Sequence, residues 1–198
     1  MSKKVVAIVG SYRRGGTIDS AVEAILAGAR EMGAETRTIY LSDQHLAYCA
    51  NCRECVQAPG PERGKCAQHD DLEPMLAEIE AADVLVLSSS VNYYNVTALF
   101  RKFLERLICY TYWPWGQMGP HPRSKLLPRK SVLVAAAGMP GFLIPFATGA
   151  ARALRLASIS LGAKPVSSLW IGLAAGVPHH ALSARVRERA RRIGWDLA

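Results

Sequence analysis

The sequence predicts an α/β fold in which a parallel sheet is covered by helices on both faces. Short apolar, β-branched segments alternate five times with segments of helical periodicity, the pattern of repeated strand–helix units. The strand segments at 5–9, 84–87 and 132–136 are continuous apolar runs, which is typical of parallel strands buried on both faces. With 198 residues, 50% of them hydrophobic, the chain is long enough for one domain with a substantial core.

Each element has its own local signal. The first strand is the apolar run at residues 5–9, which stops at Gly10. A helix follows at 18–32, where apolar residues recur at helical spacing until Gly33 ends it. The remaining strands are predicted at 36–41, 84–87, 132–136 and 165–171, and the remaining helices at 71–82, 96–109, 146–161 and 181–195.

Two connections are far longer than the ~2–6 residues usual in α/β units. Residues 43–69 contain a Pro-Gly-Pro turn and four cysteines, and residues 110–129 are rich in Trp, Tyr and Pro. We interpret both as insertions into a single domain that spans residues 1–198, because the sequence has neither an internal repeat nor a convincing linker.

The net charge of +8 raises the possibility of nucleic-acid binding. No nucleic-acid motif accompanies it, and five arginines crowd the last predicted helix, where we interpret them as a solvated face. No apolar run approaches the ~20 residues needed to cross a bilayer, and the run after the N-terminus is too short for a signal peptide. We therefore expect a cytoplasmic protein without nucleic-acid or membrane partners. The five arginines are Arg185, Arg187, Arg189, Arg191 and Arg192.

Five parallel strands favour the flavodoxin-like strand order 2-1-3-4-5. In that order, ligands bind outside the carboxyl ends of the first and third strands, where the strand order reverses. The two most distinctive loops of the chain follow those two strands.

The first loop is Gly10-Ser11-Tyr12-Arg13-Arg14-Gly15-Gly16-Thr17. Its glycines let backbone N–H groups approach an anion, the next helix supplies a positive dipole end, and Ser11, Thr17 and Arg13 add hydroxyls and a charge. These features predict a phosphate site, although a plain glycine-rich turn is the alternative. The loop matches neither a P-loop nor the dinucleotide G-x-G-x-x-G pattern, which argues against an NTPase or a Rossmann dehydrogenase.

The second loop, at residues 88–97, carries Tyr93 and Tyr94 among polar residues. It offers stacking surface and hydrogen bonds to a planar heterocycle. An ordinary loop in which Asn95 or Thr97 caps the next helix is the other interpretation, and both can hold together. A third loop of small residues, at 136–141, follows the fourth strand and could present backbone groups to a ring.

These stretches resemble the NAD(P)H-dependent FMN reductase family of flavodoxin-like proteins. The resemblance covers residues 5–108 and is specific for the family, not for a substrate. It is carried by Gly10-Ser11-x-Arg13-x-Gly15-Gly16, by Gly64-Lys65-Cys66-x-x-x-Asp70-Asp71, and by Ser89-x-Val91-x-Tyr93 with Val96-Thr97-Ala98-x-x-Arg101-x-Phe103-x-x-Arg106.

The resemblance implies an FMN site. The loop after the first strand would hold the phosphate, the loop after the third strand would wrap the isoalloxazine, and residues 137–139 would meet its pyrimidine side. Two departures stand out: Thr17-Ile18-Asp19 replaces the family's usual Asn-Thr-Ser, and Ser90 and Tyr94 replace its usual Pro and Gly. The expected FMN-binding residues are Ser11, Arg13, Gly16, Thr17, Ile18, Asp19, Ser89, Ser90, Val91, Asn92, Tyr93, Tyr94, Asn95, Ala137, Gly138 and Met139.

The implied activity is hydride transfer from NAD(P)H to the flavin N5 and then to a small acceptor, such as a quinone or a flavin. No side chain is expected to act as a general acid or base. Tyr93 and Tyr94 are the candidates to stack on or gate the ring, and Tyr112, Trp113 and Trp115 either line a substrate pocket or serve packing. A homodimer or homotetramer is expected.

The cysteines Cys49-x-x-Cys52-x-x-Cys55 and Cys66 leave the function open. They could line a loop beside the flavin, hold a 4Fe-4S cluster, or bind zinc or form a disulfide. The longer gap before Cys66 departs from the compact pattern of the family's iron–sulfur members and favours the cluster-free form. An iron–sulfur electron-transfer protein is therefore the alternative function, and a cofactor-free regulatory module, suggested by Asp19, is a third.

Overall fold

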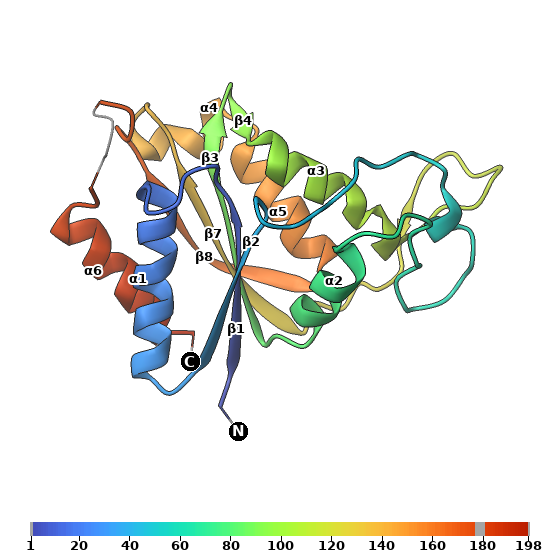
Figure 1. Cartoon of the computed structure of the whole chain (residues 1–198), viewed down its shortest axis with the longest axis horizontal. Helices are drawn as coiled ribbons and strands as arrows, with labels where there is room; N and C mark the ends of the chain where they lie inside the picture. The colour runs from blue at the N-terminus through green and yellow to red at the C-terminus, as the bar shows by residue number, and fades with distance from the viewer. Residues whose placement is uncertain (1, 177–180, 198) are drawn as a thin grey trace.

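A computed structural model describes residues 2–176 and 181–197. Its central sheet has five parallel strands in the order β2 (Glu35–Tyr40), β1 (Lys4–Gly10), β3 (Val84–Asn92), β7 (Arg129–Ala136) and β8 (Ala163–Ile171) (Figure 1). The short β4 (Asn95–Val96) pairs with β3 in antiparallel orientation. The predicted order 2-1-3-4-5 is confirmed.

Helices cover both faces of this sheet (Figure 1). The helices α1 (Thr17–Glu31) and α6 (Ala184–Trp195) lie on one face, and α2 (Leu72–Glu80), α3 (Ala98–Arg106) and α5 (Ala150–Ser160) lie on the other. Alternate side chains of each strand point to opposite faces, so β1 places Val5 and Val9 in the core under α1 and Ile8 in the core under α3 and α5. This two-sided burial explains the continuous apolar run of β1.

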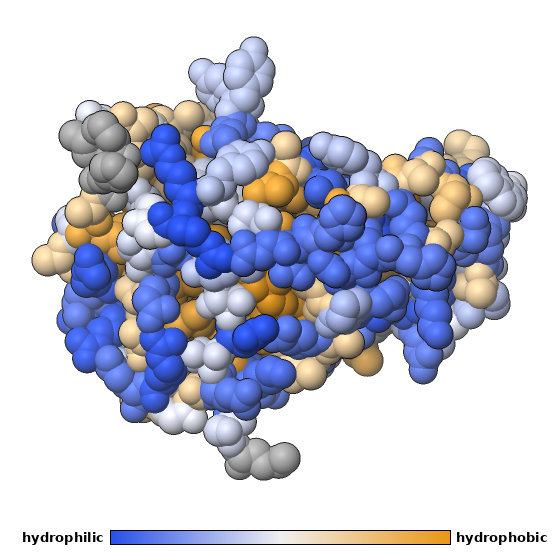
Figure 2. All heavy atoms as spheres, viewed as in Figure 1, coloured by the Kyte–Doolittle hydropathy of each residue, from blue (hydrophilic) through white to orange (hydrophobic). Residues whose placement is uncertain are grey.

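The helices α1 and α6 touch at their backbones. A Cβ atom on Gly28 would stand 2.1 Å from the Arg191 carbonyl oxygen, and one on Gly194 would stand 2.0 Å from that of Ile25. The five arginines of α6 are exposed, as predicted, and two of them form ion pairs, with Glu31 and within the helix. The face seen in Figure 2 is mostly hydrophilic, and hydrophobic residues appear on it as separate patches.

The strand β3 is longer than the predicted 84–87 and runs to Asn92. Ser88 and Ser89 are fully buried in it. The Ser88 hydroxyl donates to the Ile8 carbonyl of the neighbouring strand at 3.0 Å, and Ser89 Oγ accepts from the Thr97 amide at 3.0 Å. These serines therefore satisfy their hydroxyls inside the sheet, where the sequence indicated a loop.

The helices on this face also differ from the prediction. The predicted 146–161 helix is interrupted, because the short α4 (Ile144–Ala147) ends before Thr148 and α5 begins at Ala150. A 3₁₀ turn η3 (Gly141–Leu143) precedes α4. The break is at Thr148, which is extended (φ −135°, ψ 157°) and accepts a hydrogen bond from the Ala150 amide at 3.2 Å. The predicted 96–109 helix begins after β4 with Thr97 as its N-cap and ends in the 3₁₀ turn η2 (Leu107–Tyr110).

The two insertions lie side by side and project from the α3 end of the molecule (Figure 1). The first contains the 3₁₀ turn η1 (Glu54–Val56), and the second contains the strand pair β5 (Thr111–Tyr112) and β6 (His121–Pro122). Arg53 joins them, because its guanidinium lies 3.9 Å from the Trp113 ring centroid and 4.1 Å from that of Trp115. Trp113 and Trp115 therefore pack on the cysteine segment. Of the two roles that the sequence left open for them, pocket lining and packing, the structure shows packing.

Within the described residues, no single helix is long and apolar enough to span a membrane. A bent pair, residues 141–147 with α5, reaches that length and composition only across a 74° break.

Candidate functional site

The loop after β1 is shaped to receive an anion at the start of α1. Gly15 has a left-handed backbone (φ +66°), and Gly16 is the N-cap of α1 and supplies no side-chain capping bond. The Arg13 amide donates to Ser11 Oγ at 3.3 Å, which folds the loop back on itself. Helix N-termini of this kind attract phosphates through their amide groups and dipole.

Asp19 is directed at this same loop. Its carboxylate accepts from the Gly15 amide and from the Tyr40 hydroxyl, each at 2.6 Å. Burial and the hydrogen bond to Asp19 raise the pKa of Tyr40. The Arg14 guanidinium stacks on the Tyr40 ring at 3.1 Å and pairs with Asp43. A negative charge therefore stands beside the candidate phosphate site and also fixes the shape of the loop.

The segments after β1 and β3 meet, as the switch-point argument predicted. Ser90 Oγ lies 3.4 Å from Ser11 Oγ. Thr97 strengthens the junction, because its hydroxyl donates to the Gly10 carbonyl at 2.5 Å and accepts from the Phe100 amide at 3.2 Å. Thr97 is thus the N-cap of α3, one of the two possibilities that the sequence left open.

The tip of the β3–β4 hairpin carries the two tyrosines. Tyr93 and Tyr94 have positive φ angles (+47° and +63°), and their exposed fractions are 100% and 66%. Turns with two left-handed residues favour Asn-Gly, so two tyrosines there carry backbone strain. The Gly149 amide anchors the tip by donating to the Tyr94 carbonyl at 2.8 Å.

Among the other expected residues of this segment, some are used inside the protein, and Ser90 faces the first loop. Ser89 is fully buried, and its hydroxyl donates to the Ser90 carbonyl. Val91 and Asn92 pair with β4 as strand residues, and Asn95 Oδ1 accepts from the amide of its neighbour Val96. Ser90 therefore faces the first loop, while the Ser89 side chain is used inside the protein.

The third loop, after β7, is hydrogen-bonded to the segment that follows β8. The Ala137 carbonyl accepts from the Ala174 amide at 2.9 Å, and the Met139 carbonyl accepts from the Leu173 amide at 3.0 Å. Gly138, between them, is exposed. Since β7 is the neighbour of β3, this loop shares the carboxyl edge of the sheet with the other two.

The four clustered cysteines line one small cavity of about 20 Å³, together with Arg53 and Arg106. All are free thiols: Cys55 is buried, Cys52 is exposed, and Cys49 and Cys66 are half-buried. Within the described ranges, no three His, Cys, Asp or Glu side chains stand close enough to hold a metal ion. The pocket thus gathers four sulfurs without bringing them into ligand geometry.

The long gap before Cys66 does not separate it from the other thiols. The loop folds back so that a Cβ on Gly64 would stand 1.7 Å from the Cys55 carbonyl oxygen. The Gly64 amide donates to the Cys109 carbonyl at 2.9 Å, and Arg123 Nη2 donates to the Cys55 carbonyl at 3.1 Å. The longer spacing therefore does not keep Cys66 out of the thiol pocket, and the cluster-free form that it favours stays a prediction.

A buried ion pair lies behind Cys66. Arg106 and Asp70 side chains are 1% and 3% exposed, their nearest atoms are 2.6 Å apart, and Arg106 Nη2 is 3.3 Å from Cys66 Sγ. Burial acts to raise the pKa of Asp70, but hydrogen bonds from Arg106 and from the Ala47 and Leu72 amides outweigh it and lower that pKa. Burial, with the neighbouring thiols, raises the pKa of Cys55 to about 11.

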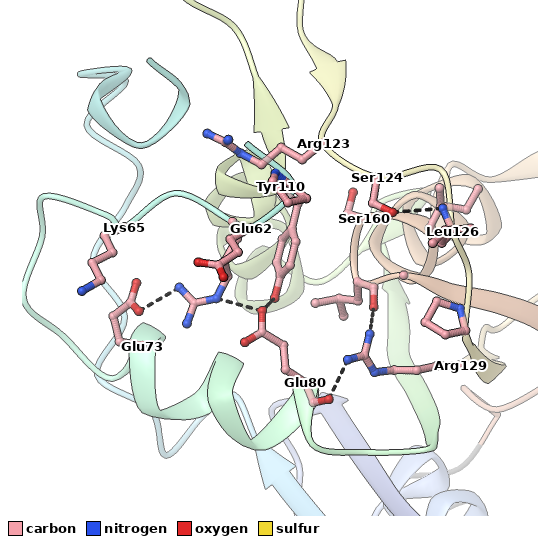
Figure 3. A pocket seen from close by; sticks show the side chains of 16 residues that line it. Glu62, Lys65, Glu73, Glu80, Tyr110, Arg123, Ser124, Leu126, Arg129 and Ser160 are labelled. Atoms are coloured by element: carbon pink, nitrogen blue, oxygen red, sulfur yellow. Dashed lines mark hydrogen bonds and ion pairs between the residues drawn. The ribbon is translucent and has the colours of Figure 1, made fainter. Parts of the chain in front are cut away.

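A larger cavity of about 590 Å³ lies at the opposite, amino-terminal edge of the sheet, near the starts of β7 and β8 (Figure 3). On its wall, Arg63 pairs with Glu73 and Glu80, and the Tyr110 hydroxyl donates to Glu80 at 2.7 Å. Burial and the bond to Glu80 raise the pKa of Tyr110. This network attaches the loop before Cys66 to α2. Its members come from three distant segments, so no local sequence signal predicts it.

Comparison with known proteins places most of the chain in one protein family. A family model described as NADPH-dependent FMN reductase matches residues 3–175. An iron–sulfur flavoprotein of Archaeoglobus fulgidus is 32% identical over 111 residues, 56% of this chain and 48% of that protein. One of Methanosarcina thermophila is 28% identical over 105 residues, 53% of this chain and 52% of that protein. The chain thus spans about half the length of these relatives.

Solved structures share the fold at low identity. The NAD(P)H:quinone oxidoreductase from Methanothermobacter marburgensis has a TM-score of 0.66 at 21% identity, with both chains fully covered. An azoreductase from Bacillus anthracis has a TM-score of 0.71 at 16% identity, covering 99% of this chain and 100% of that one. At these identities the likeness concerns the fold.

Proposed function

The chain belongs to the NADPH-dependent FMN reductase family, and on this basis we propose that it is an FMN-dependent oxidoreductase. It would accept a hydride from NAD(P)H and pass electrons to a small acceptor such as a quinone or a flavin. The observation that carries the proposal is the meeting of the loops after β1 and β3, joined by Ser11 and Ser90, beside the start of α1, where the N-cap residue is Gly16.

The residues at this edge suit the FMN phosphate. The backbone turns sharply at Gly15, and Gly16, at the N-cap of α1, has no side chain that would keep an anion from approaching the positive end of the helix. Ser11, Arg13 and the 16–18 backbone would hold the phosphate. Asp19 would stand close to it, and the hydrogen bonds from Gly15 and Tyr40 offset part of the resulting repulsion.

The hairpin tip and the third loop would hold the ring. FMN, when bound, supplies the hydride chemistry itself, so the protein binds, orients and excludes water. Tyr93 and Tyr94 offer exposed aromatic faces held in one place by the strained turn. Residues 137–139 would meet the polar edge of the ring through the exposed backbone at Gly138.

Equilibrium titration with FMN tests this proposal. We expect the purified chain to bind one FMN and, without oxygen, to lose the visible flavin band when NADPH or NADH is added. A protein that shows no flavin absorbance after FMN is added contradicts the proposal and supports the cofactor-free module. The same experiment with both nicotinamides decides which one is used.

A second candidate function, an iron–sulfur flavoprotein that transfers electrons, is favoured by the thiol pocket. Four cysteine sulfurs and two arginines line one cavity, and soft thiolate donors suit iron–sulfur clusters and zinc. Cys49, Cys52, Cys55 and Cys66 would hold a 4Fe-4S cluster after their side chains turn inward. Iron and acid-labile sulfide in an anaerobic preparation are the expected result; zinc alone indicates a zinc site, and no metal indicates the cluster-free form.

The expected homodimer or homotetramer remains a prediction. Large apolar side chains are exposed beside the hairpin tip, among them Phe142 at 71% and Phe146 at 85%, and a partner copy would cover them. Light scattering coupled to size-exclusion chromatography measures the mass directly, and a monomer at micromolar concentration contradicts the prediction.

A further inference from the structure

One backbone amide of the candidate phosphate site already binds an anionic side chain. The Gly15 amide donates to a carboxylate oxygen of Asp19 at 2.6 Å, across the turn that leads into α1. Asp19 is the third residue of α1, whose N-cap is Gly16, so its side chain reaches back past the start of its own helix. The helix dipole that attracts a phosphate attracts this carboxylate as well. Asp19 therefore occupies a donor that a phosphate would use.

The sheet holds the Asp19 carboxylate from its other side. The second carboxylate oxygen accepts from the hydroxyl of Tyr40, the last residue of β2, at 2.6 Å. Burial and this hydrogen bond raise the pKa of Tyr40, so its hydroxyl stays a donor at neutral pH. The helix α1 begins at the edge of the sheet where β1 and β2 end, which brings the two side chains together (Figure 1). Two donors thus fix both carboxylate oxygens at the loop.

In the described part of the chain, no ion pair neutralises Asp19. The Arg14 guanidinium stacks on the Tyr40 ring, but its ion pair is with Asp43. A phosphate monoester carries about −1.5 to −2 charges at neutral pH. The phosphate of FMN would therefore meet an unbalanced negative charge at the loop that receives it.

The phosphate and the carboxylate cannot share this loop without a loss of affinity. The Gly15 amide has a single N–H, so a phosphate oxygen that binds it displaces the Asp19 oxygen. A phosphate that binds beside the carboxylate instead places two like charges a few ångströms apart, which weakens binding by about tenfold or more. Riboflavin ends in a hydroxyl in place of the phosphate and avoids both costs.

We propose that Asp19 is a specificity-determining residue that competes with the flavin phosphate for the loop after β1. It lowers the affinity for FMN and leaves the affinity for riboflavin unchanged. The inference rests on the proposed FMN site, in which Ser11 and Arg13 would hold the phosphate and Asp19 opposes it.

A purely structural role for Asp19 predicts the opposite result. An acidic residue in the first turn of a helix often stabilises the helix start by accepting from a backbone amide. Loss of such an anchor would disorder the loop and weaken FMN binding. Loss of a competitor strengthens FMN binding, so the sign of the change distinguishes the two roles.

Two substitutions remove the charge of Asp19 in different ways. Asp19→Asn keeps an oxygen that can accept from the Gly15 amide, so the loop should keep its shape. Asp19→Ser introduces no amide group of its own and controls for a new hydrogen bond from asparagine to the phosphate. Glu23→Gln is the matched control, because Glu23 lies one turn further along α1, is exposed and pairs with Arg30.

Fluorescence titration measures the dissociation constants of FMN and riboflavin for the wild type and each variant, and urea denaturation checks that each variant folds. Both Asp19 variants should bind FMN about tenfold more tightly than the wild type. Their riboflavin affinity should equal that of the wild type. Glu23→Gln should bind both flavins as the wild type does.

Every other pattern of affinities overturns the inference. FMN affinity that fails to rise in both Asp19 variants shows that the carboxylate does not compete with the phosphate. A gain that riboflavin shares, or that Glu23→Gln reproduces, is not specific for the phosphate or for position 19. Asp19 variants that do not fold assign the residue to the structure of the loop.

The wild-type titration judges the proposed function separately. A wild type that binds FMN, with no gain in the Asp19 variants, overturns the inference and leaves the proposed function standing. FMN binding in the Asp19 variants alone supports the inference and contradicts the proposed function for the natural chain. No flavin binding by any of the proteins contradicts both.

Discussion

The hydroxyl of Ser90, in β3, lies 3.4 Å from the hydroxyl of Ser11, just after β1. This contact joins the two segments between which the strand order reverses, the place where ligands bind in open parallel sheets. The start of α1 and the tyrosine hairpin stand at the same edge. The predictions below follow from this arrangement and from the thiol pocket.

Arg13 should discriminate FMN from riboflavin. Arg13→Ala removes a cation from the loop that would hold the phosphate, so FMN affinity should fall about tenfold or more, as expected for a charge-assisted hydrogen bond. Riboflavin, which has no phosphate, should bind as before. Fluorescence titration with both flavins measures this, with Arg37→Ala as a control because Arg37 is on β2, exposed and paired with Glu78. Equal losses for both flavins contradict the assignment.

Relieving the backbone strain at Tyr93 and Tyr94 should stabilise the protein and weaken FMN binding. Tyr93→Asn with Tyr94→Gly gives the turn its preferred residues and should stabilise the flavin-free protein by about 1 kcal/mol. The same change removes both aromatic rings and should weaken FMN binding. Urea denaturation and FMN titration measure the two effects. A variant that gains no stability shows that the turn is unstrained, and one that binds FMN normally removes the tyrosines from the site.

The buried pair of Asp70 and Arg106 should govern stability in acid. Asp70→Asn leaves the Arg106 charge unpaired and should cost about 3 kcal/mol of unfolding free energy at neutral pH. The pKa of Asp70 is lowered by folding, so its contribution is present above its ordinary pKa of about 4 and is lost as the pH falls through the folded value. The wild-type and variant stabilities should therefore converge in acid.

Urea denaturation between neutral and acidic pH tests this convergence. Glu105→Gln, which removes an exposed partner of Arg101 on α3, should change the stability by less than about 0.5 kcal/mol. A stability difference between the wild type and Asp70→Asn that stays constant down to the acid limit would argue against the assigned pKa shift.

A substitution of Gly64 should disrupt the thiol pocket and leave the candidate FMN site at the carboxyl edge of the sheet unchanged. Gly64→Ala forces the loop away from the Cys55 carbonyl, because no Cβ fits 1.7 Å from that oxygen. Iron and sulfide uptake should fall sharply while FMN affinity stays within about twofold. Gly119→Ala, where an added Cβ meets nothing within 4 Å, is the control. Normal uptake in Gly64→Ala would contradict the folded-back loop.

The thiols should differ in reactivity without metal. Burial raises the pKa of Cys55 to about 11 and that of Cys109 to about 12, so at pH 8 only roughly a thousandth of Cys55 is the reactive thiolate. Alkylation followed by mass spectrometry should label exposed Cys52 first and Cys55 and Cys109 last. Equal labelling rates in the folded protein would contradict this order.

The strands and helices could be predicted from sequence because their signals are local. The sheet order then followed from the number of parallel strands. Ser88 and Ser89 were misread as a loop because their hydroxyls are satisfied by Ile8 and by the Thr97 amide, partners that no local pattern indicates. The helix break at Thr148 was hidden because the Thr148 side chain stabilises it with two hydrogen bonds, one donated to the Ile144 carbonyl and one accepted from the Ala150 amide.

The thiol pocket was predicted in composition but not in shape. The cysteine spacing showed only a longer gap before Cys66, and the close approach of Gly64 to the Cys55 carbonyl, which returns Cys66 to the other thiols, has no signal in it. The two arginines come from different segments and are held by Trp113 and Asp70. Such long-range partners decide the site, and only the folded chain brings them together.

The most direct test of the central claim is an anaerobic absorbance titration of the purified chain with FMN, followed by NADPH or NADH. A flavin site at the Ser11–Ser90 junction predicts saturation at one FMN per chain, weaker FMN binding in Arg13→Ala, and loss of the visible flavin band when the nicotinamide is added. No bound flavin at saturating FMN, or bound flavin that neither nicotinamide reduces, would contradict it.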